Sequence, residues 1–220
     1  MNTKKEIKID IMVEVIEYIS NKIVNNCDKL SKLDGKIGDS DHGENMKRGF
    51  KNVIKNKEKL KKKNTVRELF NEIGEIITFN VGGSAGPLFG RLFSDFGSSY
   101  EEHKYFTIEM LPSAMNSALN GVKKLGGADV GDKTMVDTIA PVVDFLNEVN
   151  LSELECNILL IKLKEEARKG LESTKLISAR KGRARYLNDR SIGHMDPGAY
   201  SCYLIFEAVE EYFNDNTEEV

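Results

Sequence analysis

Apolar residues recur at spacings of three and four along most of the chain, which is the pattern of amphipathic helices. The first such stripe runs from Ile7 to Val24. Stretches 44–60 and 65–80 read the same way, and Thr65 with Glu68 predicts a capping box at the start of the second stretch. Further helices are expected over residues 86–101, 108–125, 133–149, 152–172 and 197–213. The pattern therefore predicts about eight helices.

No glycine-bounded β-branched runs alternate with these stretches, which argues against an α/β sheet and favours an all-α fold. Pro112 and Pro141 are expected near helix starts or at kinks. No repeat or linker interrupts the 220 residues, so we expect one domain spanning residues 1–220.

Composition and charge narrow the class of protein. The 32 basic and 35 acidic residues give a formal charge of −3, which argues against a nucleic-acid partner bound by bulk charge. The three cysteines are odd in number and form no CxxC pair, which argues against a disulfide framework or a thiolate zinc site. The N-terminus is charged, and no stretch reaches 18 apolar residues. We expect a cytoplasmic protein without a membrane partner.

Four glycine- and aspartate-rich segments interrupt the predicted helices, and the first spans residues 33–46. Asp34, Asp39 and Asp41 lie within eight residues of one another, among glycines that allow a tight loop. Converging carboxylates repel one another unless a cation lies between them, and their hard oxygens favour Mg²⁺ or Ca²⁺. The alternative is that Asp39 or Asp41 only caps the helix that follows.

The second segment spans residues 80–90, where Gly82, Gly83 and Ser84 precede a predicted helix. Amides at a helix N-terminus bind anions, and small residues let a phosphate approach the backbone. The spacing fits neither a P-loop nor a dinucleotide-binding fingerprint. Gly86 and Gly90 would equally allow close packing of two helices.

The third segment spans residues 125–141. Gly126 and Gly127 are expected to end one helix, and Asp132 or Thr134 to start the next. Lys133 resembles a phosphate-binding lysine without the usual spacing. Met135 faces inward as core or as a soft wall for a planar base, while Asp137 reads as a cap.

The fourth segment, residues 179–201, carries four arginines and a turn at Asp196–Gly198 before the last helix. Arginine guanidinium groups match phosphate oxygens with two parallel donors, although an arginine-rich surface loop is the alternative. Together, the four segments predict a helical bundle whose loops form a nucleotide and Mg²⁺ site at one end.

The motifs GDSDHGENM, GGSAGPLFG, GDKTMVDTIAP and GRARYLNDRSIGHMDPGA, in this order, resemble those of the nucleotide-binding L subunits of dihydroxyacetone kinase. The resemblance implies an eight-helix antiparallel barrel with the nucleotide site formed by loops at one end. Asp34, Asp39 and Asp41 match the three aspartates that hold two Mg²⁺ ions. The positions that match contacts to ADP or ATP are His42, Gly43, Glu44, Asn45, Gly83, Ser84, Gly126, Met135, Arg183, Asp196, Pro197 and Gly198. Glu44 is expected to contribute through its backbone.

The resemblance also implies partners and a reaction. A separate K subunit holds dihydroxyacetone covalently through a histidine, and the L subunit brings the nucleotide that phosphorylates it. In the phosphotransferase-system branch, a phosphohistidine subunit, M, rephosphorylates the bound ADP. We expect the phosphotransferase-system branch and leave a homodimer open. No catalytic side chain is assigned in this chain, because the transfer is expected to be metal-assisted.

Two competing functions stay open. One is a kinase for another small sugar or for a fatty acid, although the triplet Asp41-His42-Gly43 favours the sugar branch. The other is a non-catalytic nucleotide-binding adaptor that regulates a partner.

Overall fold

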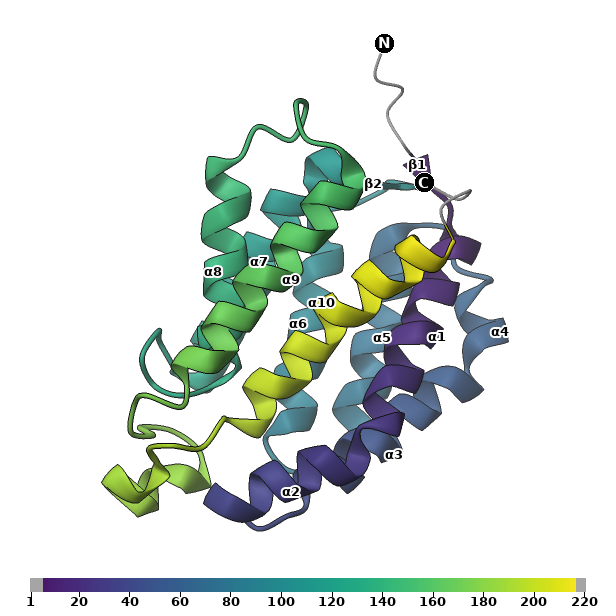
Figure 1. Cartoon of the computed structure of the whole chain (residues 1–220). Coiled ribbons are helices and arrows are strands. Elements are labelled where there is room, and N and C mark those ends of the chain that lie inside the picture. Colours follow the sequence, from purple (N-terminus) through teal and green to yellow (C-terminus); the bar gives the residue numbers. More distant parts are fainter. Residues whose placement is uncertain (1–5, 217–220) are drawn as a thin grey trace.

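The computed structural model describes residues 6–216 and is almost entirely helical, as the hydrophobic pattern predicts (Figure 1). Two short strands, β1 (Glu6–Ile7) and β2 (Phe106–Thr107), pair in antiparallel register. The helices are α1 (Ile9–Asn25), α2 (Cys27–Ile37), α3 (His42–Lys55), α4 (Lys57–Leu60), α5 (Val66–Asn80), α6 (Ala85–Ser98), α7 (Leu111–Gly126), α8 (Met135–Glu148), α9 (Cys156–Ser173) and α10 (Pro197–Asp215), with the 3₁₀ helices η1 (Ile108–Met110) and η2 (Arg183–Ser191).

Eight of these helices contact one another in a closed order, which we call the helix ring: α1, α3, α5, α6, α7, α8, α9, α10 and back to α1. Helix α2 packs outside this order against α3 and α10. The connections before α3, α6, α8 and α10 all lie at the lower end of the ring in Figure 1. The ring therefore gathers the four glycine-rich segments at one end. The contacts establish which helices are neighbours, and a regular barrel geometry stays a prediction.

The start of α5 confirms most of the predicted cap. Thr65 is the N-cap, and its Oγ1 accepts a hydrogen bond from the backbone N–H of Glu68 at 3.1 Å. The Glu68 carboxylate, however, accepts from the backbone N–H of Asn64 at 2.9 Å instead of that of Thr65. The reciprocal bond is thus shifted by one residue, and the predicted capping box is incomplete.

The expected number of helices is too small: residues 6–216 contain ten α-helices. Part of the difference is α2, where buried Cys27, Leu30 and Ile37 lie at helical spacings among lysines and a glycine that mask the stripe. The rest is a break at Asn56, which divides the expected helix 44–60 into α3 and α4.

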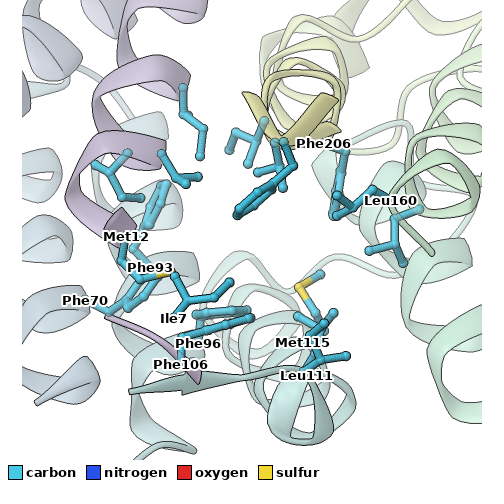
Figure 2. Close-up of a pocket in the computed structure, with 18 of the residues that line it drawn as sticks. Ile7, Met12, Phe70, Phe93, Phe96, Phe106, Leu111, Met115, Leu160 and Phe206 are labelled. Atoms are coloured by element: carbon cyan, nitrogen blue, oxygen red, sulfur yellow. The ribbon is translucent and has the colours of Figure 1, made fainter. Parts of the chain in front are cut away.

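The interior of the helix ring is apolar, and it leaves a cavity of about 170 Å³ toward the end where β1 and β2 pair (Figure 2). Figure 2 shows Met115 of α7, Leu160 of α9 and Phe206 of α10 lining this space. Phe96 and Phe106 stack beside it, with their ring centroids 6.4 Å apart. In residues 6–216, no helix has both the length and the apolar character that a membrane crossing needs.

Candidate nucleotide and metal site

A second cavity, of about 660 Å³, opens at the loop end of the helix ring. Its volume is in the range of sites that hold a small organic molecule. Every predicted site residue except Gly43 and Glu44 lines it. These lining residues are Asp34, Asp39, Asp41, His42, Asn45, Gly83, Ser84, Gly126, Met135, Arg183, Asp196, Pro197 and Gly198. The fold thus brings all four segments together around one space.

Three carboxylates converge at one side of this cavity. One oxygen each of Asp34, Asp39 and Asp41 lies within 4.8 Å of the others. Asp39 and Asp41 are exposed, whereas Asp34 is buried in the last turns of α2. The first carboxylate is therefore held by a helix, and the prediction that one loop carries all three is wrong. Helix α2 therefore anchors the buried carboxylate of Asp34.

The environment of these carboxylates fits a hard cation. Burial raises the pKa of Asp34, and the charges of Asp39 and Asp41 raise it further, so the cluster carries an electrostatic penalty on its own. Arg183 offsets part of this repulsion between carboxylates, since its Nη1 lies 2.8 Å from Oδ2 of Asp39. Three carboxylate oxygens in one concave site are the donor set that suits Mg²⁺.

His42 is the first residue of α3, and its imidazole is buried against α10. Its Nε2 lies 2.9 Å from Oγ of Ser201, and its backbone N–H donates to Oδ2 of Asp34 at 3.2 Å. Burial lowers the pKa of His42 to about 4, so the ring is neutral at physiological pH. The side chain therefore ties the first segment to the last helix.

Gly43 and Glu44 do not line the cavity. A Cβ on Gly43 would lie 2.1 Å from the carbonyl oxygen of Cys27, so this glycine lets α3 pack closely on α2. The carboxylate of Glu44 accepts from Cys27 Sγ at 3.1 Å and pairs with Lys47 at 3.0 Å, outside the cavity. A role for the Glu44 side chain in the site is thus not supported, as expected from the motif.

The second segment presents the start of α6 to the cavity. Ser84 is the N-cap, but no side-chain hydrogen bond caps this helix. Gly83 has φ of +65° and no atom within 4 Å of a Cβ position, which leaves its backbone exposed toward the cavity. On the neighbouring α3, Oδ1 of Asn45 accepts from Arg48 at 3.0 Å. An uncapped helix N-terminus beside glycines is suited to an oxyanion.

Gly86 and Gly90 serve helix packing, the alternative that the sequence left open. A Cβ on Gly86 would lie 2.4 Å from the carbonyl oxygen of Val81. A Cβ on Gly90 would lie 2.7 Å from the carbonyl oxygen of Gly74 on α5. Helices α5 and α6 therefore approach too closely for larger residues at these positions.

Lys133 does not offer its ammonium group to the cavity as a phosphate-binding lysine would. The residue is 1% exposed, and its Nζ donates to the backbone carbonyls of Thr174, Ile177 and His194. Thr174 is the C-cap of α9, where the helix dipole favours a cation. Burial lowers the pKa of Lys133, and the charges of Asp196 and Asp137 oppose that shift. Lys133 thus joins the third segment to the fourth.

Helices α8 and α10 begin at this cavity with their own side-chain caps. At α8, Asp137 accepts from the backbone N–H groups of Gly131 at 2.6 Å and Thr134 at 2.7 Å. At α10, Asp196 accepts from the N–H of Ala199 at 2.8 Å. Burial raises the pKa of the Asp196 carboxyl to about 7, with the charge of Asp137 contributing. The predicted starts at Thr134 and at the Asp196 turn are confirmed.

The wall formed by α6, α7 and α8 is apolar. Leu88, Val122 and Leu125 line it together with the predicted Met135. The sequence motifs assign no site role to Leu88, Val122 or Leu125. The one sequence feature that points to them is their position near the glycines that end or begin helices. The cavity therefore has a carboxylate side, a glycine and helix-start side, and an apolar side.

These features define a class of protein: an all-helical domain with a loop-built cavity whose lining suits a phosphate-bearing, partly apolar ligand and a divalent cation. Residues 36–211 match the family described as "Dak2: DAK2 domain". The chain therefore belongs to the DAK2 domain family.

Relatives of known name agree with the resemblance drawn from the motifs. The chain is 37% identical over 178 residues to the "PEP-dependent dihydroxyacetone kinase, ADP-binding subunit DhaL" of Escherichia coli, covering 81% of this chain and 84% of that one. It is 35% identical over 205 residues to the "PTS-dependent dihydroxyacetone kinase, ADP-binding subunit DhaL" of Lactococcus lactis, covering 92% and 97%. The resemblance to L subunits, and the assignment to a phosphotransferase family, are thus confirmed.

A solved structure supports the same fold. The dihydroxyacetone kinase from C. freundii in complex with AMP-PNP and Mg²⁺ superposes with a TM-score of 0.73 and 28% identity. The match covers 92% of this chain but only 34% of that one. The chain thus spans about a third of that longer kinase, in which the matched part is one region among others.

Proposed function

We propose that the chain is the nucleotide-binding subunit of a dihydroxyacetone kinase. It holds ADP or ATP with two Mg²⁺ ions and passes a phosphoryl group to dihydroxyacetone on a separate K subunit. A phosphohistidine M subunit of the phosphotransferase system then rephosphorylates the ADP in place. The observation that carries the proposal is the convergence of the carboxylates, the α6 start and the apolar wall on one cavity.

The three sides of the cavity suggest how a nucleotide lies in it. The base packs on the apolar wall near Met135, where burial of a planar ring is favourable. The phosphates lie near Gly83 and Ser84, with Asp34 and Asp39 beyond them on the carboxylate side. This orientation directs the terminal phosphate to the charged side of the opening.

The carboxylates Asp34, Asp39 and Asp41 would hold the magnesium ions. Bound Mg²⁺ supplies positive charge that neutralises phosphate oxygens during transfer. Arg183 provides a further positive group beside Asp39 and is exposed to the cavity. These residues bind and orient the phosphates and offset their charge, which is most of what phosphoryl transfer requires from a protein.

Activation of the acceptor hydroxyl belongs to the partner in this proposal. The His42 imidazole is hydrogen-bonded to Ser201, and the Lys133 ammonium group is hydrogen-bonded to three backbone carbonyls, so both side chains already have partners within the protein. In this proposal the partner therefore determines which acceptor is phosphorylated. A kinase for another small sugar stays a second candidate, since an L-erythrulose 1-kinase of Mycolicibacterium smegmatis is 29% identical over 202 residues.

Calorimetry on Asp39→Asn tests the nucleotide site. We expect the affinity for ADP with Mg²⁺ to fall at least about tenfold, because a charged ligand to the cation is lost. Asp28→Asn is the matched control, since Asp28 is exposed on α2 and does not line the cavity. Unchanged affinity in Asp39→Asn would contradict the proposal.

The phosphoryl donor is tested separately. Phosphate transfer from phosphoenolpyruvate to dihydroxyacetone is expected to need this chain together with K and M subunits. Stoichiometric ADP released on denaturation of the purified protein would support permanent binding and rephosphorylation in place. An empty site with rapid ATP exchange would instead indicate an ordinary ATP-dependent kinase.

A further inference from the structure

The fourth segment, residues 179–201, brings three exposed or half-buried cations to the wall of the loop-end cavity: Lys181, Arg183 and Arg185. Arg183 contacts a carboxylate, with its Nη1 2.8 Å from Oδ2 of Asp39. The Nζ of Lys181 is 3.8 Å from the position of a Cβ on Gly127, the C-cap of α7, and a helix C-terminus stabilises a cation. Two of the three cations therefore have a source of negative charge within the protein.

Arg185 differs from these two, because the part of the chain that the structure describes provides no carboxylate partner for it. Its guanidinium group lies 4.7 Å from the ring centroid of Tyr186, and its Nη2 donates to the Tyr186 hydroxyl at 2.6 Å. Both side chains are exposed, and Arg185 lines the cavity. Tyr186 thus orients a cation whose charge no carboxylate of residues 6–216 neutralises.

The place of Arg185 in η2 suits one phosphate more than a nucleoside diphosphate carries. Arg183 and Arg185 are two residues apart in this 3₁₀ helix, or about 4 Å along its axis, and Arg183 is the one beside the carboxylates. A third phosphate adds negative charge to a cavity already lined by Asp34, Asp39 and Asp41, so it needs a further cation. A guanidinium group meets this need with two parallel donors to phosphate oxygens.

We propose that Arg185, oriented by Tyr186, is a specificity-determining residue for the third phosphate of a nucleoside triphosphate. The inference rests on the proposed function, since it depends on a nucleotide whose phosphates extend toward the carboxylate side. It adds a preference to that site: Arg185 strengthens the binding of ATP relative to ADP, whereas Arg183 serves both. The nucleotide that carries the transferable phosphoryl group is therefore stabilised selectively.

The test is calorimetry on Arg185→Gln with two ligands in the presence of Mg²⁺: ADP, and AMP-PNP, the nucleotide named in the C. freundii structure. Arg190→Gln is the matched control, because Arg190 is also exposed on η2 but does not line the cavity. Arg185→Lys keeps the charge without the paired donors, and Tyr186→Phe keeps the ring without the hydroxyl. Circular dichroism checks that each variant is folded.

We expect Arg185→Gln to lower the affinity for AMP-PNP about tenfold, as for the loss of one charge-assisted hydrogen bond, with the affinity for ADP changed less than about twofold. Arg185→Lys and Tyr186→Phe should each lose about twofold to threefold for AMP-PNP alone, because charge or orientation is only partly lost. Arg190→Gln should match the unmodified chain.

Equal losses for the two nucleotides in Arg185→Gln, or no loss for either, would overturn the proposal. An Arg185→Gln variant that is altered only in the concentration of K subunit needed for transfer would assign the residue to a partner and would also overturn it. If the unmodified chain binds neither nucleotide, the proposed function itself is refuted, and this inference with it.

Discussion

The buried imidazole of His42 makes the stability of the fold depend on pH in a way that one substitution isolates. Burial holds the pKa of His42 at about 4, against an ordinary value of 6.5. The unfolded chain binds a proton on this histidine as the pH falls below 6.5, whereas the folded chain does so only near 4. The stabilisation present above pH 6.5 is therefore lost as the pH falls from 6.5 to 4.

The expected size of the effect follows from that difference in pKa. Two and a half pKa units correspond to about 3 kcal/mol in full, and about 2 kcal/mol of this is lost between pH 7.5 and pH 5. Asp196 acts in the opposite direction, because its pKa is raised and its protonation stabilises the folded state at low pH. Comparison with a His42→Gln variant removes this second contribution, since Asp196 is present in both proteins.

The assay is urea unfolding of the metal-free protein at pH 7.5 and pH 5, followed by circular dichroism. We expect the difference in unfolding free energy between the unmodified chain and His42→Gln to shrink by about 2 kcal/mol at the lower pH. Ser201→Ala is the control: it removes the hydrogen-bond partner but keeps the buried imidazole, so it should retain the pH dependence of the unmodified chain. A difference that stays constant within about 0.5 kcal/mol would refute a buried, neutral His42.

Three further substitutions test features of the same end of the molecule. Lys133→Met should lower the unfolding free energy by about 2–5 kcal/mol in urea titrations, because three buried carbonyls lose their donor; a loss below about 0.5 kcal/mol would contradict the role of Lys133 as a structural clamp. Gly170→Ala should be far more damaging than Gly83→Ala. A Cβ at Gly170 would lie 2.1 Å from the carbonyl oxygen of Asp137. At Gly83 the space around a Cβ is open, and the cost of alanine comes only from the backbone φ of +65°. We expect about 3 kcal/mol for the first and about 1 kcal/mol for the second in the same assay, and equal losses would contradict this reading of the packing.

Much of the fold and most of the candidate site could be predicted from local sequence. Helical stripes and the Thr65 cap depend on neighbours within a few residues, so the pattern alone indicates them. The site segments were recognisable because glycines and aspartates are unusual at this density. Ring closure then brings residues as distant as Asp34 and Asp196 to one cavity, as the motifs imply.

What could not be predicted depends on contacts between distant segments. Lys133 resembles a phosphate-binding lysine by sequence, but its partners are carbonyls of residues 174–194, which the chain brings to it only in the folded state. Helix α2 was missed because its buried face includes Asp34, a charged residue that interrupts the apolar stripe. The exposure of Phe79 and Leu176 could not be predicted either, since both look like ordinary core residues until the fold exposes them.

The closed order of the helix ring has a consequence for tethering. Because α10 begins at the cavity and runs for 19 residues, its last residue, Asp215, lies about 28 Å away, at the end where β1 pairs with β2 (Figure 1). A domain joined at either end of residues 6–216 is thus attached on the side remote from the cavity. A linker that returns to the opening must cover the length of the ring, roughly nine extended residues. Such a tether raises the local concentration of a partner without orienting it, so the alignment of donor and acceptor depends on the surface around the opening.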